Sequence, residues 1–207
     1  MPRAARPRTG TAVDVLAIAL DDCRAPRLRP LPQEVAELLQ ELGAPPRLVA
    51  HLRAVHEVAG QLLGWVAEHC PALEVDREAV LFGAATHDIG KVRHPAELSG
   101  PGSAHEPAGR ELLLEHGVAE ELARFAAGHA TWDAPGTRAE DLLVSLADKV
   151  WKNKRLPDLE DRVVAELCRA GGRPGWEEFL ALDELLTRIG DGAEERLAYQ
   201  AAHPVLG

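Results

Sequence analysis

Helical periodicity is the feature that most constrains the fold of this chain. From residue 32 onward, apolar residues recur at three- and four-residue spacings, and no stretch alternates apolar and polar residues long enough to predict a strand. Glycine and proline divide the pattern into segments, because proline is tolerated in a first helical turn and glycine in a left-handed cap. We expect helices at residues 34–42, 47–69, 76–89, 119–130, 158–170 and 175–202. The predicted fold class is all-α.

Two capping-box patterns predict further helix starts near residues 104 and 138. Ser103 precedes Glu106 by three residues, and Thr137 precedes Glu140 by the same spacing. In a capping box, the hydroxyl and the carboxylate each accept a hydrogen bond from a free backbone amide at the helix start. Both patterns therefore place a helix start in a region where apolar periodicity alone does not fix it.

The composition indicates a globular protein with an acidic surface. The chain has 207 residues, of which 46% are hydrophobic and 27% charged, so it can bury a core without disulfides. The 23 Lys and Arg against 33 Asp and Glu give a net charge of -10. Such a balance disfavours a protein that binds a nucleic acid duplex through its phosphates. An anionic substrate would have to meet a local cluster of basic residues.

We divide the chain into three regions. Residues 1–32 contain six arginines and five prolines, and we expect a partly disordered arm with one short packed helix in the apolar run at 12–20. Residues 33–156 form the expected core. Residues 157–207 add helices that either cap the core or form the surface of a homodimer.

Cysteine usage favours a cytoplasmic location. Cys23, Cys70 and Cys168 are odd in number and contain no CxxC pair, so they indicate neither a disulfide framework nor a cysteine zinc site. The apolar run near the N-terminus is interrupted by Asp14 and is followed by Asp21 where an export signal needs small residues. No segment is long enough to span a membrane, and we expect no membrane partner.

Several histidines and aspartates fall on apolar helix faces. His51 shares a face with Val55, Val58 and Leu62, and the pair His87-Asp88 ends an otherwise apolar helix. Three further residues show the same inward placement on other predicted helices: His105, His129 and Asp148. Taken singly, each has a simpler explanation, such as a core histidine satisfied by hydrogen bonds, a surface His–Asp pair, or a salt bridge from Asp148 to Lys152.

One shared cause explains the six residues better than separate coincidences. Imidazoles and carboxylates that converge in a helical core make a metal site, and a nitrogen and oxygen donor set without thiolate favours iron or manganese over structural zinc. Six ligands exceed the need of one open site. Two divalent ions bridged by a carboxylate would use them all, with a hydroxide held between the ions.

The order of these residues resembles the HD-domain superfamily of metal-dependent phosphohydrolases. The resemblance rests on HLRAVHEVA at residues 51–59, AATHDIGK at 84–91 and LADK at 146–149. Two more stretches, HEPAG at 105–109 and GHAT at 128–131, are similar to the subgroup that binds two metals. The resemblance covers about residues 45–156 and implies an HD-domain helical bundle, here followed by extra C-terminal helices.

The resemblance also implies a ligand assignment. His51, His87, Asp88 and Asp148 would bind the first metal, and Asp88 would bridge to a second metal. His105 and His129 would complete the second site. His56 competes with His51, but five residues along a helix is a rotation of about 140°, so the two cannot share a face. The other histidines, His69, His94, His116 and His203, match no ligand motif.

The few lysines lie close to the expected ligands. Of four lysines, Lys91 follows Asp88 by three residues, and the other three, Lys149, Lys152 and Lys154, follow Asp148. We assign substrate binding to Lys91, Arg93, Lys149, Lys152 and Arg155. A solvated helix end explains the second cluster equally well. Trp132 and Trp151 flank two ligands and either pack in the core or stack on a base.

The expected reaction is hydrolysis of a phosphoester or phosphoanhydride in a small anionic substrate. A bridging water attacks phosphorus in line, while the metals and Lys91 take up charge on the phosphoryl oxygens, so that Asp88 and Lys91 are the catalytic residues. The motif spacing is similar to HD hydrolases that split diadenosine tetraphosphate symmetrically, which favours a nucleotide or dinucleoside polyphosphate. Two alternatives are a mixed-valent di-iron HD oxygenase, like inositol oxygenase, and a noncatalytic nucleotide-binding protein.

Overall fold

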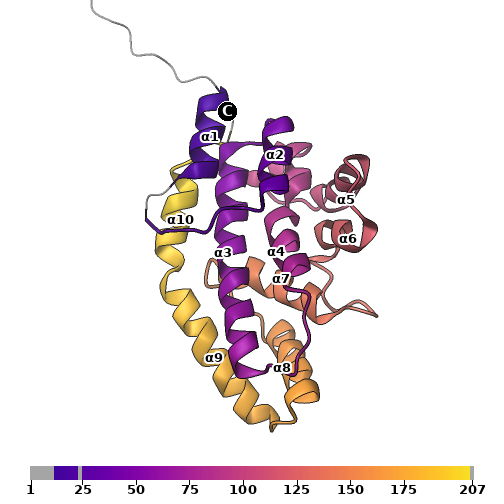
Figure 1. Ribbon diagram of the computed structural model, residues 1–207. Coiled ribbons are helices and arrows are strands. Elements are labelled where there is room, and N and C mark those ends of the chain that lie inside the picture. Colours follow the sequence, from indigo (N-terminus) through magenta and orange to yellow (C-terminus); the bar gives the residue numbers. More distant parts are fainter. Residues whose placement is uncertain (1–11, 23–24, 206–207) are drawn as a thin grey trace, which may run out of the picture.

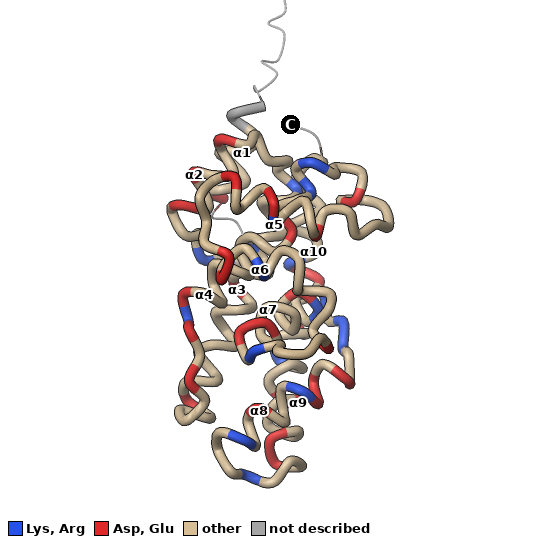
Figure 2. Tube along the Cα trace, turned by 90° about the vertical axis from the view of Figure 1, so that its right-hand side faces the viewer, with Lys and Arg blue, Asp and Glu red and all other residues tan. Residues whose placement is uncertain are grey.

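The structure is a computed structural model that describes residues 12–22 and 25–205. The expected disorder in the first part of the arm falls at residues 1–11, outside the described residues. Lys and Arg are interspersed with Asp and Glu along the described trace (Figure 2).

Within the described residues, the regular structure consists of ten α-helices and two short 3-10 helices, with no strand (Figure 1). These are α1 (Ala12–Asp21), α2 (Gln33–Glu41), α3 (Pro46–His69), α4 (Arg77–Thr86), η1 (Ile89–Val92), η2 (Pro95–Leu98), α5 (His105–Glu115), α6 (Glu120–Gly128), α7 (Ala139–Val150), α8 (Pro157–Gly171), α9 (Gly175–Asp191) and α10 (Ala193–Ala201). The all-α prediction is confirmed. None of the described helices combines the length and the apolar character needed to cross a membrane.

Helix α3 is the axis of the molecule (Figure 1). Residues 48–56 are all buried, and a helix that is buried on every side must be surrounded by others. Helices α4 and α7 pack against it, the α5–α6 pair packs on α4, and α1 and α10 cover its first half. The α8–α9 hairpin closes the end near His69.

Two hydrophobic clusters meet along α3 and α4. One cluster includes Val55 of α3 and Val80 of α4 together with residues of α7, α8 and α9. The other includes Leu48 of α3 and Phe82 of α4 together with residues of α1, α2, α5 and α6. Since α3 and α4 contribute to both clusters, side chains on these two helices are fixed from both sides.

The short helix expected in the arm is confirmed as α1. Leu16, Ala19 and Leu20 are buried, and α1 packs against α3. Arg53 of α3 donates hydrogen bonds to the Ala19 carbonyl at 2.8 Å and to the Tyr199 hydroxyl of α10 at 2.8 Å. One buried guanidinium thus joins the arm, the central helix and the C-terminal helix.

The capping-box predictions are wrong in detail, although the helices start near the expected residues. Helix α5 has no side-chain cap from Ser103; instead, the Glu97 carboxylate accepts from the backbone amides of Ala104 and His105, both at 3.2 Å. Helix α7 begins one residue later than expected, and Asp141 rather than Glu140 accepts from the Arg138 amide. In both places a carboxylate other than the predicted one accepts from the free amides.

The long helix expected at 175–202 is two helices divided at Gly192. A β-carbon at Gly192 would lie 2.8 Å from Nη1 of Arg196. The guanidinium of Arg196 thus occupies the space beside Gly192, at the break between α9 and α10.

The free energy of unfolding should fall as the pH is lowered from about 7 to 4, partly because of His56. This residue is 3% exposed, and neither ring nitrogen has a hydrogen-bond partner in the part of the chain that the structure describes. Burial and then the nearby Arg29 lower its pKa to about 4, against about 6.5 in the unfolded chain. Between these values the unfolded state binds more protons, so acidification costs the folded state about 3 kcal/mol.

Urea unfolding at a series of pH values would measure this effect. In His56→Leu, the decline between pH 6.5 and 4 should be shallower by most of that amount, with stability at pH 7 nearly unchanged. His116→Leu, at an exposed histidine, controls for the loss of an imidazole. Equal pH slopes in wild type and His56→Leu would contradict the assignment.

Candidate metal centre

The six predicted ligands come together from five helices. His51 lies on α3, His87 caps the end of α4, and Asp88 follows it. The other three are His105 at the start of α5, His129 at the end of α6, and Asp148 in the last turn of α7. All six side chains belong to residues at most 7% exposed.

A glycine allows the two parts of this cluster to approach. A β-carbon at Gly90 would lie 1.9 Å from the carbonyl oxygen of His105 and 2.5 Å from the amide nitrogen of Gly109. No side chain fits there. Gly90 therefore lets η1, which follows Asp88 directly, touch the first turn of α5, and this contact carries His105 to Asp88.

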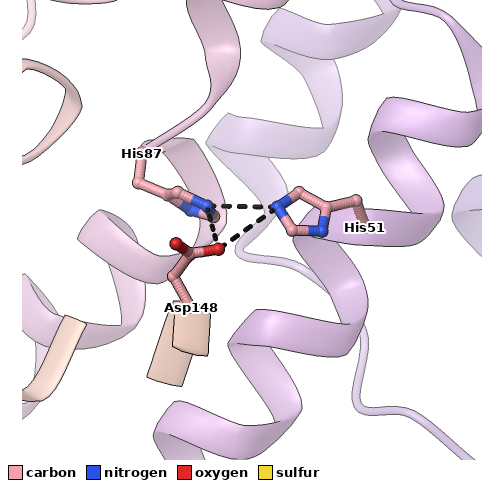
Figure 3. A group of neighbouring side chains, drawn as sticks. All are labelled: His51, His87 and Asp148. Carbon is pink, nitrogen blue, oxygen red and sulfur yellow. Dashed lines mark hydrogen bonds and ion pairs between the residues drawn. The ribbon is translucent and has the colours of Figure 1, made fainter. Parts of the chain in front are cut away.

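His51, His87 and Asp148 form the first group of ligand atoms. Their side chains point toward one another from three helices (Figure 3). The Nε2 atoms of His51 and His87 are 3.2 Å apart, and Oδ1 of Asp148 lies 3.8 Å from the former and 3.5 Å from the latter. This spacing leaves the three donor atoms around one common point.

Asp88, His105 and His129 form the second group, and Asp88 also faces the first. Its Oδ1 lies 3.0 Å from Nε2 of His105 and 3.6 Å from Nε2 of His129. Its Oδ2 lies 3.0 Å from Nε2 of His51 and 3.6 Å from Nε2 of His87. One carboxylate thus presents one oxygen to each group, which is the arrangement of a bridging ligand.

Hydrogen bonds at Nδ1 orient three of the four rings. Nδ1–H of His87 donates to the Ala84 carbonyl at 3.0 Å, and Nδ1–H of His129 donates to the Ala126 carbonyl at 3.1 Å. Nδ1–H of His105 donates to the Glu97 carboxylate at 2.5 Å. Partners of this kind fix the tautomer of metal-binding histidines and leave Nε2 to bind the ion.

The remaining ring, His51, is oriented by packing and by the contact of its Nε2 with Asp88. Its buried Nδ1 has no hydrogen-bond partner among the described residues. The ring instead meets Trp151 edge-on, with the centroids 4.9 Å apart. Trp151 is 3% exposed, so its position agrees with a packing role beside the ligand.

The donor set fits divalent cations. Nε2 of His87 and Nε2 of His129 are the ring nitrogens that the hydrogen bonds to backbone carbonyls leave free, and both face carboxylate oxygens. Nε2 of His105 likewise faces a carboxylate oxygen, Oδ1 of Asp88. Such a cluster of acceptors is costly in a buried site unless cations occupy it.

The electrostatic environment keeps most of these ligands unprotonated near neutral pH. Burial lowers the pKa of His51, and it lowers that of His129 to about 4. Burial would raise the pKa of Asp88, but the neighbouring histidines, above all His87, outweigh it and hold the pKa well below the usual value. The pKa of Asp148 is lowered in the same way, by His87 and Lys149.

His105 differs from the other histidines of the cluster. Burial acts to lower its pKa, but hydrogen bonding to Asp88 and Glu97 outweighs burial and raises the pKa. An ion in the second group would therefore displace a proton from His105 when the pH lies below that pKa.

Of the five predicted substrate-binding cations, three lie at the cluster. Nζ of Lys91 donates to Oδ2 of Asp88 at 2.5 Å, and Nζ of Lys149 donates to Oδ2 of Asp148 at 2.6 Å. Lys152 and Lys91 both line a cavity that reaches His51. Asp148 pairs with Lys149 and not with Lys152.

The two predicted arginines are paired elsewhere. Arg93 pairs with Glu115, and Arg155 with Glu160 and Asp183. Neither lines the cavity at His51. Their substrate-binding role stays a prediction.

Sequence reasoning missed Glu97. This residue of η2 binds Nδ1 of His105 with one oxygen and caps α5 with both. The hydrogen bond from His105 lowers the pKa of Glu97 and keeps it ionised. The number of residues between a 3-10 turn and the following helix follows no periodic rule. Sequence reasoning could therefore have searched only for an acidic residue at an unspecified distance before His105.

A family model of the HD domain matches residues 32–169. The chain belongs to the HD-domain family. This family consists generally of metal-dependent hydrolases, and the predicted resemblance is confirmed at that level. No curated protein sequence and no solved structure gives a match. In this HD-domain protein, the matched region runs from the start of α2 into α8, and α9 and α10 lie outside it.

Removing the bridging carboxylate should empty both groups. We expect about two divalent ions per chain in the wild type, about one in Asp148→Ala and close to none in Asp88→Ala, because only Asp88 serves both groups. Elemental analysis of the purified proteins measures this. Asp133→Ala, at an exposed aspartate, is the matched control. Equal metal content in Asp88→Ala and wild type would rule out the bridging role.

Glu97→Gln should weaken the second ion selectively. The amide keeps the shape of the side chain but removes the negative charge that orients His105, a loss that typically costs about 10- to 100-fold in metal affinity. Competition with a chelator measures the two affinities. Glu106→Gln, one residue after His105, serves as the control. If both ions are held as tightly in Glu97→Gln as in wild type, Glu97 only caps α5.

Proposed function

We propose that this HD-domain protein is a phosphohydrolase that uses two divalent ions, iron or manganese, to cleave a phosphoester or phosphoanhydride. The proposed substrate is a nucleotide or a dinucleoside polyphosphate in the cytoplasm. The observation that carries the proposal is the position of Asp88, whose two oxygens face two separate groups of buried ligand atoms.

A cavity beside the first group supports an anionic substrate. Its lining includes His51, the cations Lys91 and Lys152, and the Glu97 carboxylate, which accepts a hydrogen bond from His105. Lys152 has no carboxylate partner among the described residues, and its Nζ lies 5.8 Å from the centre of the Trp151 ring. The chain has a net charge of -10, so the ammonium group of Lys152, beside a cavity lined by a candidate metal ligand, is a local site for a phosphate.

Hydrolysis joins the oxygen of water to phosphorus, breaks the bond from phosphorus to the leaving oxygen, and returns a proton to that oxygen. Divalent ions in such a site lower the pKa of bound water and offset charge on the phosphoryl oxygens. Asp88 and Asp148, ionised at neutral pH, supply the negative charge that holds the ions. Lys91 places a positive charge within reach of both Asp88 and the cavity, where negative charge grows in the transition state.

Lys91→Gln should keep both ions and lose turnover by about 100-fold, a usual loss when one stabilising group for transition-state charge is removed. The measurement is phosphate release from nucleotides and dinucleoside polyphosphates with manganese or iron added, alongside metal analysis. Lys154→Gln is the matched control, because Lys154 is exposed and does not line the cavity.

The same assay run without oxygen separates the reaction classes. Hydrolysis should continue anaerobically at an unchanged rate. Product formation that requires oxygen would indicate a di-iron oxygenase instead, and ligand binding without any phosphate release would indicate a noncatalytic protein.

A further inference from the structure

Helix α10 supplies part of the cavity wall next to the metal centre. Leu197 and Gln200, three residues apart on α10, line the same cavity as His51, Lys91 and Lys152. Leu98 of η2 contributes a second apolar side chain to that cavity. The HD-family match ends at residue 169, so the α10 wall belongs to the part of the chain outside it.

Hydrogen bonds from two arginines to backbone carbonyls hold this wall in place. Nε of Arg196, a residue 5% exposed, donates to the carbonyl of Trp151 at 2.7 Å. Trp151 itself packs against His51, so α10 is connected to a ligand through two contacts. At the other end, Arg47 of α3 donates to the carbonyls of Ala201 and His203 at 3.1 and 3.0 Å. Residues 197 and 200 are thus presented by a fixed helix rather than by a loop.

The two α10 side chains of this wall are only partly engaged by the fold. Leu197 is 40% exposed although it is a large apolar residue. The carboxamide of Gln200 has no hydrogen-bond partner among the residues that the structure describes, and it can both donate and accept. An apolar contact next to a two-way hydrogen-bonding group suits the organic part of a ligand more than a bare phosphate.

The size of the cavity limits that organic part. Its volume is about 310 Å³, at the low end of the roughly 300–1,000 Å³ usual for ligand pockets. One mononucleotide-sized body fits such a space, whereas the second half of a dinucleoside polyphosphate would extend beyond it.

We propose that Leu197 and Gln200 bind the organic body of the substrate, while its phosphate lies toward Lys91 and Lys152. The ligand class is a phosphorylated molecule of mononucleotide size, or one such end of a larger one. The assignment rests on the phosphohydrolase function proposed above. It makes α10 the element that distinguishes one phosphorylated substrate from another.

Binding measurements on the full-length, manganese-loaded protein test this role without relying on turnover. The probes are the four nucleoside 5′-monophosphates and inorganic phosphate, titrated by calorimetry. Leu197→Ala and Gln200→Ala should each weaken the best nucleotide by about 5- to 20-fold, as expected for the loss of one apolar or hydrogen-bonding contact, and leave inorganic phosphate unchanged. Lys152→Ala should weaken both probes.

Matched controls come from the same chain. Leu180→Ala changes an exposed leucine of α9 that does not line the cavity, and Lys154→Ala changes a lysine two residues from Lys152. Both should bind all probes as the wild type does, and every variant should retain its metal content.

The outcomes separate the two proposals. Unchanged nucleotide binding in both α10 variants, or a wild type that binds nucleotides no better than phosphate, would overturn the role of α10. If phosphate release is absent for every substrate while the α10 variants still lose nucleotide binding, the hydrolase proposal fails and the binding site stands. If both α10 variants release phosphate with the KM of the wild type, the hydrolase proposal stands and only the role of α10 fails.

Discussion

The structure depends on the burial of one ionised carboxylate, Asp88, among imidazole rings. A buried carboxylate is stable only when positive charge or donors surround it, and here every neighbour is a potential metal ligand or a lysine. The two sides of Asp88 face two groups of ligands, so the helices that carry them must meet at one residue. The packing of five helices is, in this sense, set by the requirements of a single side chain.

Packing provides this meeting point through small residues and helix ends. Because Gly90 has no side chain, η1 can contact α5 directly. The three rings of His87, His105 and His129 lie at helix termini. At a terminus, the ring can donate to a nearby carbonyl or carboxylate and direct its other nitrogen inward. Helices α3 and α4, fixed between two hydrophobic clusters, hold His51 and His87 rigidly, which a preorganised site requires.

The convergence of the candidate ligand residues could be predicted because each is a polar side chain on an apolar helix face. A histidine or aspartate on an apolar helix face is visible from periodicity, and six of them suggested one cause. Glu97 could not be found this way, because it lies in a 3-10 turn and acts across a loop on His105. The division at Gly192 was missed because the sequences of α9 and α10 continue one helical pattern. The partners of Arg93 and Arg155 were missed because they depend on tertiary contacts, which sequence spacing does not reveal.

The division at Gly192 matters for function because it separates two helices with different packing partners. Helix α9 packs against α8, whereas α10 packs against α3. Arg196, whose guanidinium occupies the space beside Gly192, ties α10 to the carbonyl of Trp151. The chain beyond the family-matched region therefore contributes to the cavity beside the candidate metal centre, so that the proposed chemistry lies in the HD domain and the proposed choice of substrate in a helix that follows it.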